Sequence, residues 1–531
     1  MTKKQTITIT SLAIAAIILG LLVSNRLWFR FDLTRHKAYT ISKVSKDLGR
    51  GLEEPVLITY FVSDKLKKLF PNPGEIEDLV REYTTYSKGK IRFAVRDPEA
   101  EGIDQQMQNI GIPAQQINLQ ERNAASVSMV YSGIFIEYLD KTDVIPVVFN
   151  LDTLEYDLTS RIRSLISGTK REAGVLVGIQ GKNLTQNFKY VKQFLEMAGF
   201  TVNQLYEDSE IDSDLGELIV IGGVDTLSDA SLYRIDNYIA RGGKVLFLTE
   251  TVAIETSYGI NARKLEDLGL LSMLNHYGIS VADALVLDQA AITDLFYTPT
   301  GVQLMRYPFW VNVLRENASK DHPVVSNFAG LDLFWPNPIR IIEKNDVEST
   351  MLLKTTEVAW LQTKDFVLDP ASSYMMGAEK GETEGAYGLA ASLSGKIPSF
   401  WRDKPKPKLD NEGDGVEPLP DLPSVSAASR IIVIGNTKFV EDETIRDKRN
   451  LDLFVSAADW LSNDDDIINI RNRVQGVGRL DKIQDEDKRF AAMTFARLFN
   501  TILIPLAVLI FGLYWANKRK KLTKKESDDA V

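Results

Sequence analysis

Two long uncharged stretches lie at the ends of the chain. The first covers residues 5–25 and is bracketed by Lys4 and Arg26; the second covers residues 498–517. About 20 residues of α-helix, rising 1.5 Å each, cross a hydrocarbon core of roughly 30 Å. The pattern therefore predicts one transmembrane helix within residues 1–28 and another over the second stretch.

Each stretch has a second interpretation. The first could be a cleaved signal peptide, although the letters VSNRLWF that follow Leu22 offer no pair of small residues for cleavage. The second could be a buried core helix, but its length and the basic tail at 518–531 argue against this. Because positive charge favours the cytoplasmic side, we expect both termini in the cytoplasm and the large middle outside the cytoplasmic membrane, in the periplasm or the extracellular space.

Residues 38–170 alternate between short strands and amphipathic helices. The predicted order, β-α-β-α-β-β-α, is the thioredoxin-like order. A thioredoxin-like redox site uses a CxxC motif, and this chain contains no Cys. We therefore expect a scaffold without redox activity. The predicted strands are 56–61, 90–95, 129–139 and 143–149, and the predicted helices are 75–88, 103–110 and one that ends at Gly168.

Residues 171–480 carry unbroken apolar runs of four to six residues. Such runs fit parallel strands that are buried on both faces of a sheet. Between them lie two amphipathic helices, the second predicted to start after Ser228 as its N-cap and to stop at Gly242. The arrangement predicts a doubly wound parallel sheet in an α/β fold. Its strands are expected at 174–179, 218–221, 244–248 and, much later, 430–434.

An insertion and a polar loop interrupt this second domain. The pattern over residues 256–400 predicts no topology, only single elements. Residues 402–427 are rich in Pro, Asp, Glu, Lys and Gly, which predicts a disordered loop. Residues 481–497 form a juxtamembrane segment. The expected single elements are a helix at 265–277, strands at 340–342 and 351–353, and a helix at 450–463.

Composition narrows the chemistry. The net charge of −10 gives nucleic acid no basic surface to bind. The absence of Cys excludes disulfides, thiolate metal sites and a Cys nucleophile, and the three His are far apart with no HExxH. No GxxxxGK[ST] occurs, so ATP hydrolysis by a P-loop is not expected. No GxGxxG follows a strand and no GxSxG is present. We expect no catalytic residue, metal or cofactor.

Candidate ligand-facing residues lie at the carboxyl ends of the predicted parallel strands, where open α/β sheets bind ligands. Glycines there let a backbone approach closely, and Asp225 could cap a turn or bind. Tight β–α turns would explain the same glycines without any ligand. The candidates are Gln180, Gly181, Gly222, Gly223, Asp225, Thr249 and Glu250.

Aromatic residues offer a different site. Trp310, Phe334, Trp335 and Trp401 could line a sugar-binding surface or could be core, and core is the interpretation we favour. Carboxylates are abundant, so a glycosidase pair stays open, but no pattern places two of them at one site.

Several short motifs follow one another along the chain in a recognisable order. They are FDLT at 31–34, YTIS at 39–42, LEYDLTS at 154–160, RIIVIGN at 430–436 and Pro505 in the last apolar stretch. In this order they resemble the GldG family, the auxiliary component of gliding-motility-type ABC transporters. The resemblance covers nearly the whole chain and is weakest over 256–400.

The resemblance implies a membrane-anchored, non-enzymatic subunit that works with a separate ABC permease and a separate ABC ATPase, and whose outer body binds or gates cargo. It also implies that the second domain is similar to glutamine-amidotransferase-like folds, without their Cys nucleophile. Many relatives carry a Gly-His-Gly-Glu-like turn where this chain has Gly178-Ile179-Gln180-Gly181-Lys182. Two alternatives stay open: a membrane-tethered glycan-binding protein or hydrolase of the envelope, and a structural anchor.

Overall fold

A computed structural model of the 531-residue chain divides into two compact units, residues 1–475 and 476–531. The structure describes most of the first unit and a few short pieces of the second. The described residues are 40–462 and 470, except 122–123, 150, 152, 169–170, 257–258, 299–300, 327, 371–382, 409–418 and 447–448, together with short pieces between 494 and 514.

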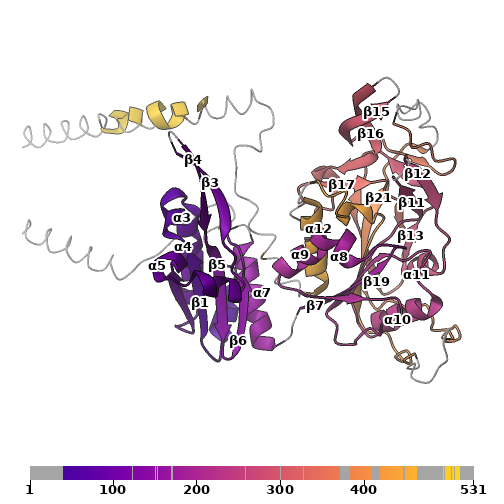
Figure 1. Ribbon diagram of the computed structural model, residues 1–531, viewed down its shortest axis with the longest axis horizontal. Coiled ribbons are helices and arrows are strands. Elements are labelled where there is room, and N and C mark those ends of the chain that lie inside the picture. Colours follow the sequence, from indigo (N-terminus) through magenta and orange to yellow (C-terminus); the bar gives the residue numbers. More distant parts are fainter. Residues whose placement is uncertain are drawn as a thin grey trace, which may run out of the picture. The chain divides into compact units, whose positions relative to one another are not determined.

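A four-stranded sheet forms the centre of residues 40–168 (Figure 1). Its strands lie in the order β2-β1-β5-β6. Strand β1 pairs in parallel with β2 and antiparallel with β5, and β5 returns through a tight turn into β6. The strands predicted at 129–139 and 143–149 overlap β5 and β6, and Leu139 in the turn between them has φ +55°. The bounds are β1 Val56–Val62, β2 Ile91–Arg96, β5 Ser132–Tyr138 and β6 Lys141–Ile145.

Helices cover this sheet with apolar faces at helical spacing. Ile76, Val80 and Tyr83 of α4 are fully or almost fully buried, as are Leu158 and Ile162 of α7. The hairpin β3–β4 was not predicted. The bounds are α2 Lys43–Gly51, α3 Asp64–Leu69, α4 Asn72–Tyr86, α5 Pro98–Glu101, α6 Asp104–Asn109, β3 Gln115–Glu121, β4 Ala124–Val130 and α7 Leu154–Ser167.

The described part of residues 171–470 contains a sheet of nine strands, five of which run parallel in the order β22-β10-β9-β7-β8. The four predicted parallel strands are confirmed; β8 was not predicted. The bounds are β7 Glu172–Gly178, β8 Thr201–Leu205, β9 Glu217–Gly222, β10 Val245–Leu248 and β22 Ser429–Ile434.

The rest of this sheet is antiparallel, which corrects the expectation of a parallel sheet. Strand β21 pairs antiparallel with β22, and β18 and β19 then pair antiparallel with β21. These strands come from the insertion, whose pattern predicted only two of them. The fold is therefore mixed α/β. The bounds are β13 Ile279–Val281, β18 Ile339–Ile341, β19 Val347–Lys354 and β21 Gly388–Gly395.

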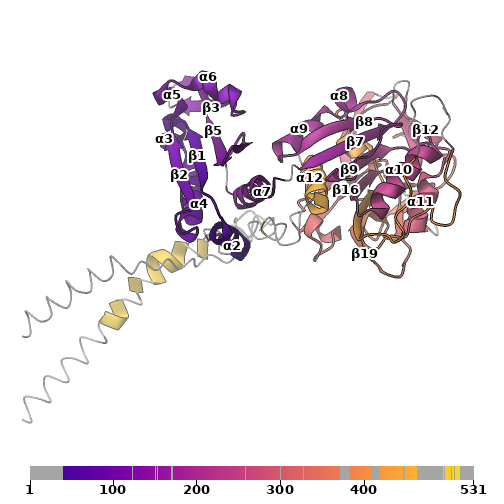
Figure 2. The same cartoon turned by 90° about the horizontal axis from the view of Figure 1, so that it is seen from below.

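Helices lie on both faces of this sheet (Figure 2). Leu246 of β10 points into the core under α9 and α12, whereas its neighbour Phe247 points into the core under α10 and α11. Ser228 caps α10 as predicted, because its hydroxyl accepts from the Ser231 N–H at 3.3 Å. The bounds are α8 Leu184–Asn187, α9 Lys189–Met197, α10 Asp229–Ala240, α11 Leu270–Tyr277 and α12 Arg449–Ser462.

Three small sheets complete the domain around an aromatic core. Phe334 and Trp335 are at most 4% exposed in this core, and Trp310 packs against it partly buried. Trp401, 5% exposed, lies instead in the core under α10 and α11. The core interpretation of these aromatics is confirmed. The strands are β11 Val252–Glu255, β12 Asn261–Lys264, β14 Leu285–Leu287, β15 Ala291–Thr298, β16 Gly301–Val313, β17 Leu331–Phe334 and β20 Trp360–Gln362, with short 3₁₀ turns η1 Arg315–Asn317, η2 Pro323–Val325 and η5 Lys438–Val440.

The loop predicted to be disordered packs on α10 along its described flanks, which corrects that expectation for residues 402–408 and 419–427. Tyr233 donates to the Pro420 carbonyl at 2.8 Å, and Asn237 donates to the Asp421 carbonyl at 3.0 Å. Leu419 is 5% exposed. Backbone carbonyls, together with the side chains of Leu419 and Leu422, hold this polar segment against the domain. Residues 409–418 lie outside the described residues.

The second unit contributes the short helical turn η8 Phe499–Leu503. The predicted membrane helix within 1–28 lies outside the described residues, and the one at 498–517 falls only partly within them. Among the helices that the structure does describe, none has both the length and the apolar character needed to span a bilayer.

Glu217, at the start of β9, gives the stability of the fold a pH dependence. The side chain is fully buried, and neither carboxylate oxygen has a hydrogen-bond partner among the described residues. Burial raises the pKa of Glu217 well above its ordinary value, although Arg171 and Lys244 act in the opposite direction. The folded protein therefore holds this proton more tightly than the unfolded chain does.

We expect Glu217→Gln to abolish a loss of stability that the wild type shows as pH rises. In the wild type, the stabilisation that comes from the more tightly held Glu217 proton is fully present below about pH 4.5. It is lost as the pH rises through the folded-state pKa of Glu217. Each unit of difference between folded and unfolded pKa corresponds to about 1.4 kcal/mol. Urea unfolding from pH 4.5 to 8 measures this. The two proteins should agree at low pH and separate at high pH; parallel curves would contradict the assignment.

Candidate functional site

The carboxyl ends of β7 and β9 form a topological switch point. Strand β8, which follows β7 in sequence, lies on one side of β7, and β9 lies on the other. Open α/β sheets bind ligands in the crevice at such a point. A cavity of about 290 Å³ lies there, and we call it the carboxyl-edge cavity.

Five of the seven candidate residues line this cavity together. They are Gln180, Gly222, Gly223, Asp225 and Glu250. The other two candidates do not line it: Gly181 is exposed in the turn after β7, and Thr249 is fully buried with its hydroxyl unpartnered among the described residues. That any of the seven contacts a ligand stays a prediction.

Glycines shape one wall because the ends of β7 and β9 nearly touch. Gly222 and Gly223 have φ of +81° and +98°, a region that favours glycine. The Gly223 N–H donates to the Gly178 carbonyl at 2.8 Å. A Cβ on Gly178 would lie 2.8 Å from the Gly223 Cα, so this wall has no room for a side chain.

We expect Gly178→Ala to destabilise the domain by about 1–3 kcal/mol, because the added methyl group forces the two strand ends apart. Gly74→Ala in α4 is the matched control: its Cβ would meet nothing within 4 Å, so the change should be neutral or slightly stabilising. Thermal unfolding measures both. Equal melting temperatures for the two variants would show that the strand ends are not in close contact.

Two lysines that line the cavity come from distant parts of the chain and share one buried carboxylate. Lys182 follows β7, Lys438 follows β22, and both pair with Glu441, which is 3% exposed. The Lys438 Nζ lies 3.5 Å from the Glu441 Oε2. Each ammonium has three donors, so both lysines keep donors for a ligand.

Glu250 lies beside this pair at the end of β10. The Thr437 hydroxyl donates to its Oε2 at 2.6 Å, and the side chain is 8% exposed. Burial raises the pKa of Glu250, while the positive charge of Lys438 opposes the shift. A carboxyl group in this setting can exchange hydrogen bonds with a polar ligand.

The hairpin β11–β12 supplies the other wall. Arg263 of β12 lies 3.4 Å from the Asp225 carboxylate, and Glu255 of β11 also faces the cavity. Opposite charges thus pair across the lining. The lining residues include no Ser, Cys or His, so they lack a nucleophile with a histidine base. The lining suits the binding of a polar ligand.

Sequence reasoning missed Lys438, Glu441, Arg263 and Glu255. Lys438 could have been found from the sequence. The RIIVI strand was predicted to join the parallel sheet, so the residues after it lie at the same carboxyl edge as the other candidates. No comparable signal existed for the hairpin, which comes from the part of the chain without a predicted topology.

Comparison with known proteins shows which family the chain belongs to. Residues 170–470, more than half of the chain, match the model of a family described as an ABC-type uncharacterized transport system. The chain belongs to this ABC transport auxiliary family. The matched region contains the whole carboxyl-edge cavity. Residues 35–137 of this auxiliary protein match a domain of unknown function.

A curated relative extends over nearly the full length. An uncharacterized protein of Borreliella burgdorferi is 27% identical over 504 residues, which cover 93% of the auxiliary protein and 94% of that relative. These findings support the ABC transporter auxiliary family; the narrower GldG assignment stays a prediction.

Similarity to solved structures is weak. The mmIFT52 N-terminal domain gives a TM-score of 0.32 at 13% identity, covering 55% of the auxiliary protein and 98% of that chain. The exo-beta-1,4-mannosidase Op5Man5 from Opitutaceae bacterium strain TAV5 gives 0.23 at 8% identity, covering 73% and 49%. Scores this low carry no argument about fold or function.

Proposed function

We propose that the auxiliary protein is a non-enzymatic subunit of an ABC transporter and that its second domain binds a polar ligand, the cargo or a signal for it, in the carboxyl-edge cavity. One observation carries the proposal: the domain that defines the family holds a preformed cavity at a topological switch point. A separate permease and a separate ATPase would perform the transport.

Two features favour binding over catalysis. The charges of Lys182, Lys438 and Arg263 already pair with carboxylates, so the cavity is organised before a ligand arrives. The sequence also lacks the P-loop that ATP hydrolysis by that route needs. Purified full-length protein should therefore release no more phosphate from ATP than a protein-free blank; steady turnover would overturn the proposal.

We further propose that residues 5–25 and 498–517 anchor the auxiliary protein in the lipid of the cytoplasmic membrane, with both termini in the cytoplasm. The uncharged stretches and the basic tail support this. The protein should stay in the membrane pellet after alkaline carbonate washing, and protease outside spheroplasts should cleave the central domains. Release into the wash or full protection from protease would contradict the anchoring.

Two finer fold assignments belong to the same proposal. The order β2-β1-β5-β6 with a parallel β1–β2 pair supports a thioredoxin-like first domain without CxxC. The five parallel strands with helices on both faces support an amidotransferase-like second domain that has acquired antiparallel strands. Within the family, the order of sequence motifs supports GldG.

The glycan-binding or hydrolase alternative gains no support from the cavity. Sugar sites usually place aromatic rings against the ligand, and no aromatic residue lines the carboxyl-edge cavity. Phe334, Trp335 and Trp401 are buried in hydrophobic cores. We therefore retain the transporter subunit as the proposal.

A further inference from the structure

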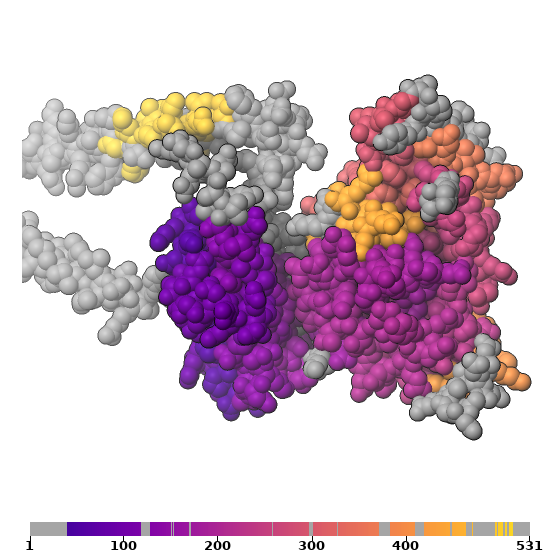
Figure 3. Space-filling view, in the orientation of Figure 1, coloured from indigo at the N-terminus to yellow at the C-terminus, as the bar shows by residue number. Residues whose placement is uncertain are grey.

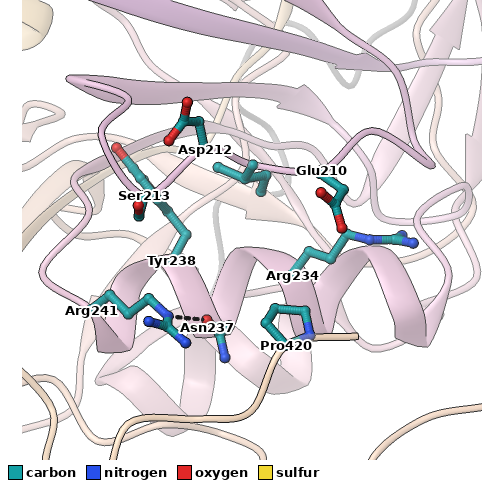
Figure 4. Close-up of a pocket in the computed structure, with 9 residues that line it drawn as sticks. Glu210, Asp212, Ser213, Arg234, Asn237, Tyr238, Arg241 and Pro420 are labelled. Carbon is teal, nitrogen blue, oxygen red and sulfur yellow. Dashed lines mark hydrogen bonds between the residues drawn. The ribbon is translucent and has the colours of Figure 1, made fainter. Parts of the chain in front are cut away.

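A second cavity, of about 560 Å³, lies between helix α10 and the loop that joins β8 to β9 (Figure 4). Loop residues 210–213 form one wall, and α10 residues from Arg234 to Arg241 form the other; Pro420 closes one end. The cavity shares no lining residue with the carboxyl-edge cavity. We call it the helix-α10 cavity.

The two walls carry opposite charges that do not meet. Glu210 and Asp212 lie on the loop wall, and Arg234 and Arg241 lie on the helix wall, seven residues apart and so on one face. Within the part of the chain that the structure describes, neither carboxylate forms an ion pair with either arginine. The cavity therefore separates an acidic wall from a basic wall.

The two arginines differ in what they already bind. Arg241 donates to the Asn237 Oδ1 at 2.6 Å and to the Asp421 carbonyl at 2.9 Å, which fixes it against the packed loop. The Arg234 Nη1 is buried and has no hydrogen-bond partner among the described residues. Arg234 as a whole is only half-buried and its side chain forms no hydrogen bond or ion pair among the described residues, so the accessible part of its guanidinium is free to pair with a ligand in the cavity.

We propose that the helix-α10 cavity binds a small zwitterion, a free amino acid or a short peptide with free termini. The ligand carboxylate pairs with the Arg234 guanidinium, whose planar fork matches a carboxylate in two parallel hydrogen bonds. The ligand ammonium faces Glu210 and Asp212 across the cavity. The volume lies within the ordinary range for small-molecule sites.

Calorimetry of the full-length protein in detergent with the dipeptide Ala-Ala tests the charge requirement. We expect saturable binding of the free dipeptide, and binding at least tenfold weaker when the amine is acetylated or the carboxylate is amidated. Equal binding of all three forms, or no binding of the free dipeptide up to 10 mM (about 2.7 kcal/mol), would overturn the proposal.

Variants place the site. Arg234→Gln should weaken binding of the free dipeptide at least tenfold. Glu210 and Asp212 are exposed on their loop, so the double change Glu210→Gln and Asp212→Asn should not disturb the fold. It should weaken binding of the free dipeptide but leave binding of the acetylated dipeptide unchanged. Arg340→Gln, an exposed arginine of β18, is the matched control and should bind as the wild type does. Binding that survives Arg234→Gln, or that falls equally in the control, would overturn the assignment. Because the ATPase and membrane tests do not involve this cavity, its failure leaves the proposed function standing.

Discussion

Replacing Asp236 with alanine is expected to lower the free energy of unfolding of the second domain by about 3–5 kcal/mol, because it leaves several buried hydrogen-bond donors without an acceptor. The Asp236 carboxylate is fully buried in the middle of α10. It accepts hydrogen bonds from the Tyr277 and Ser399 hydroxyls, both at 2.6 Å, and from the backbone N–H groups of Phe400 and Trp401 at 2.9 and 3.3 Å. One side chain thus joins α10 to α11 and to the segment after β21.

Asp229→Ala on the first turn of the same helix is the matched control. Asp229 is exposed and contributes mainly through the helix dipole, so its loss should cost less than about 1 kcal/mol. Urea unfolding followed by tryptophan fluorescence compares the two, since Trp401 lies directly beside Asp236. A cost for Asp236→Ala as small as that of the control would show that this network does not hold the domain together.

Arg171→Ala is expected to cost a similar amount, about 3–5 kcal/mol, because it removes the cation that pairs with a buried carboxylate. Arg171 precedes β7 and pairs with Asp459 of α12, which is 2% exposed and 288 residues away in sequence. Its guanidinium also donates to the Ala198 carbonyl at 2.9 Å and lies 3.9 Å from the centre of the Phe200 ring. In Figure 3, α12 (orange) lies directly against the magenta surface of the β7–α9 region.

A double-mutant cycle with Asp459→Ala separates this pair from simple loss of packing. The double variant should be more stable than the sum of the two single losses predicts, because the favourable interaction between the two charges is then lost only once. Lys192→Ala in the exposed Lys192–Glu196 pair of α9 should change stability by less than about 0.5 kcal/mol. Strict additivity of the two single variants would contradict the ion pair.

The parallel core of the second domain was predictable because buried strands leave continuous apolar runs. GVLVGI, LIVI, KVLFL and RIIVI all became strands of one sheet. Strand β8, with the sequence TVNQL, was missed because it lies at the edge, is only half-buried and includes polar residues. The antiparallel strand β13 has only three residues, too few for an alternating pattern to be recognised. Strands β18 and β19 were predicted as single strands, but not their place in the sheet.

The candidate site was predictable as far as topology fixes it. Parallel strands bring their carboxyl ends to one edge, and this rule alone placed Gln180, Asp225 and Glu250 around one cavity. Arg263 could not be placed, since it arrives on a hairpin whose position depends on tertiary packing. The ordered packing of the loop around Asp421 was missed for a different reason. The composition of the loop shows that apolar side chains are few, but it does not show that backbone carbonyls of the loop accept hydrogen bonds from α10.

Purification of the full-length protein from its own membranes in a mild detergent tests the central claim most directly. The account predicts that a multispan permease and an ATP-hydrolysing subunit are recovered with it in fixed ratio, and that the recovered assembly hydrolyses ATP. Recovery of the protein alone, under conditions in which another ABC transporter from the same membranes stays intact, would contradict the account.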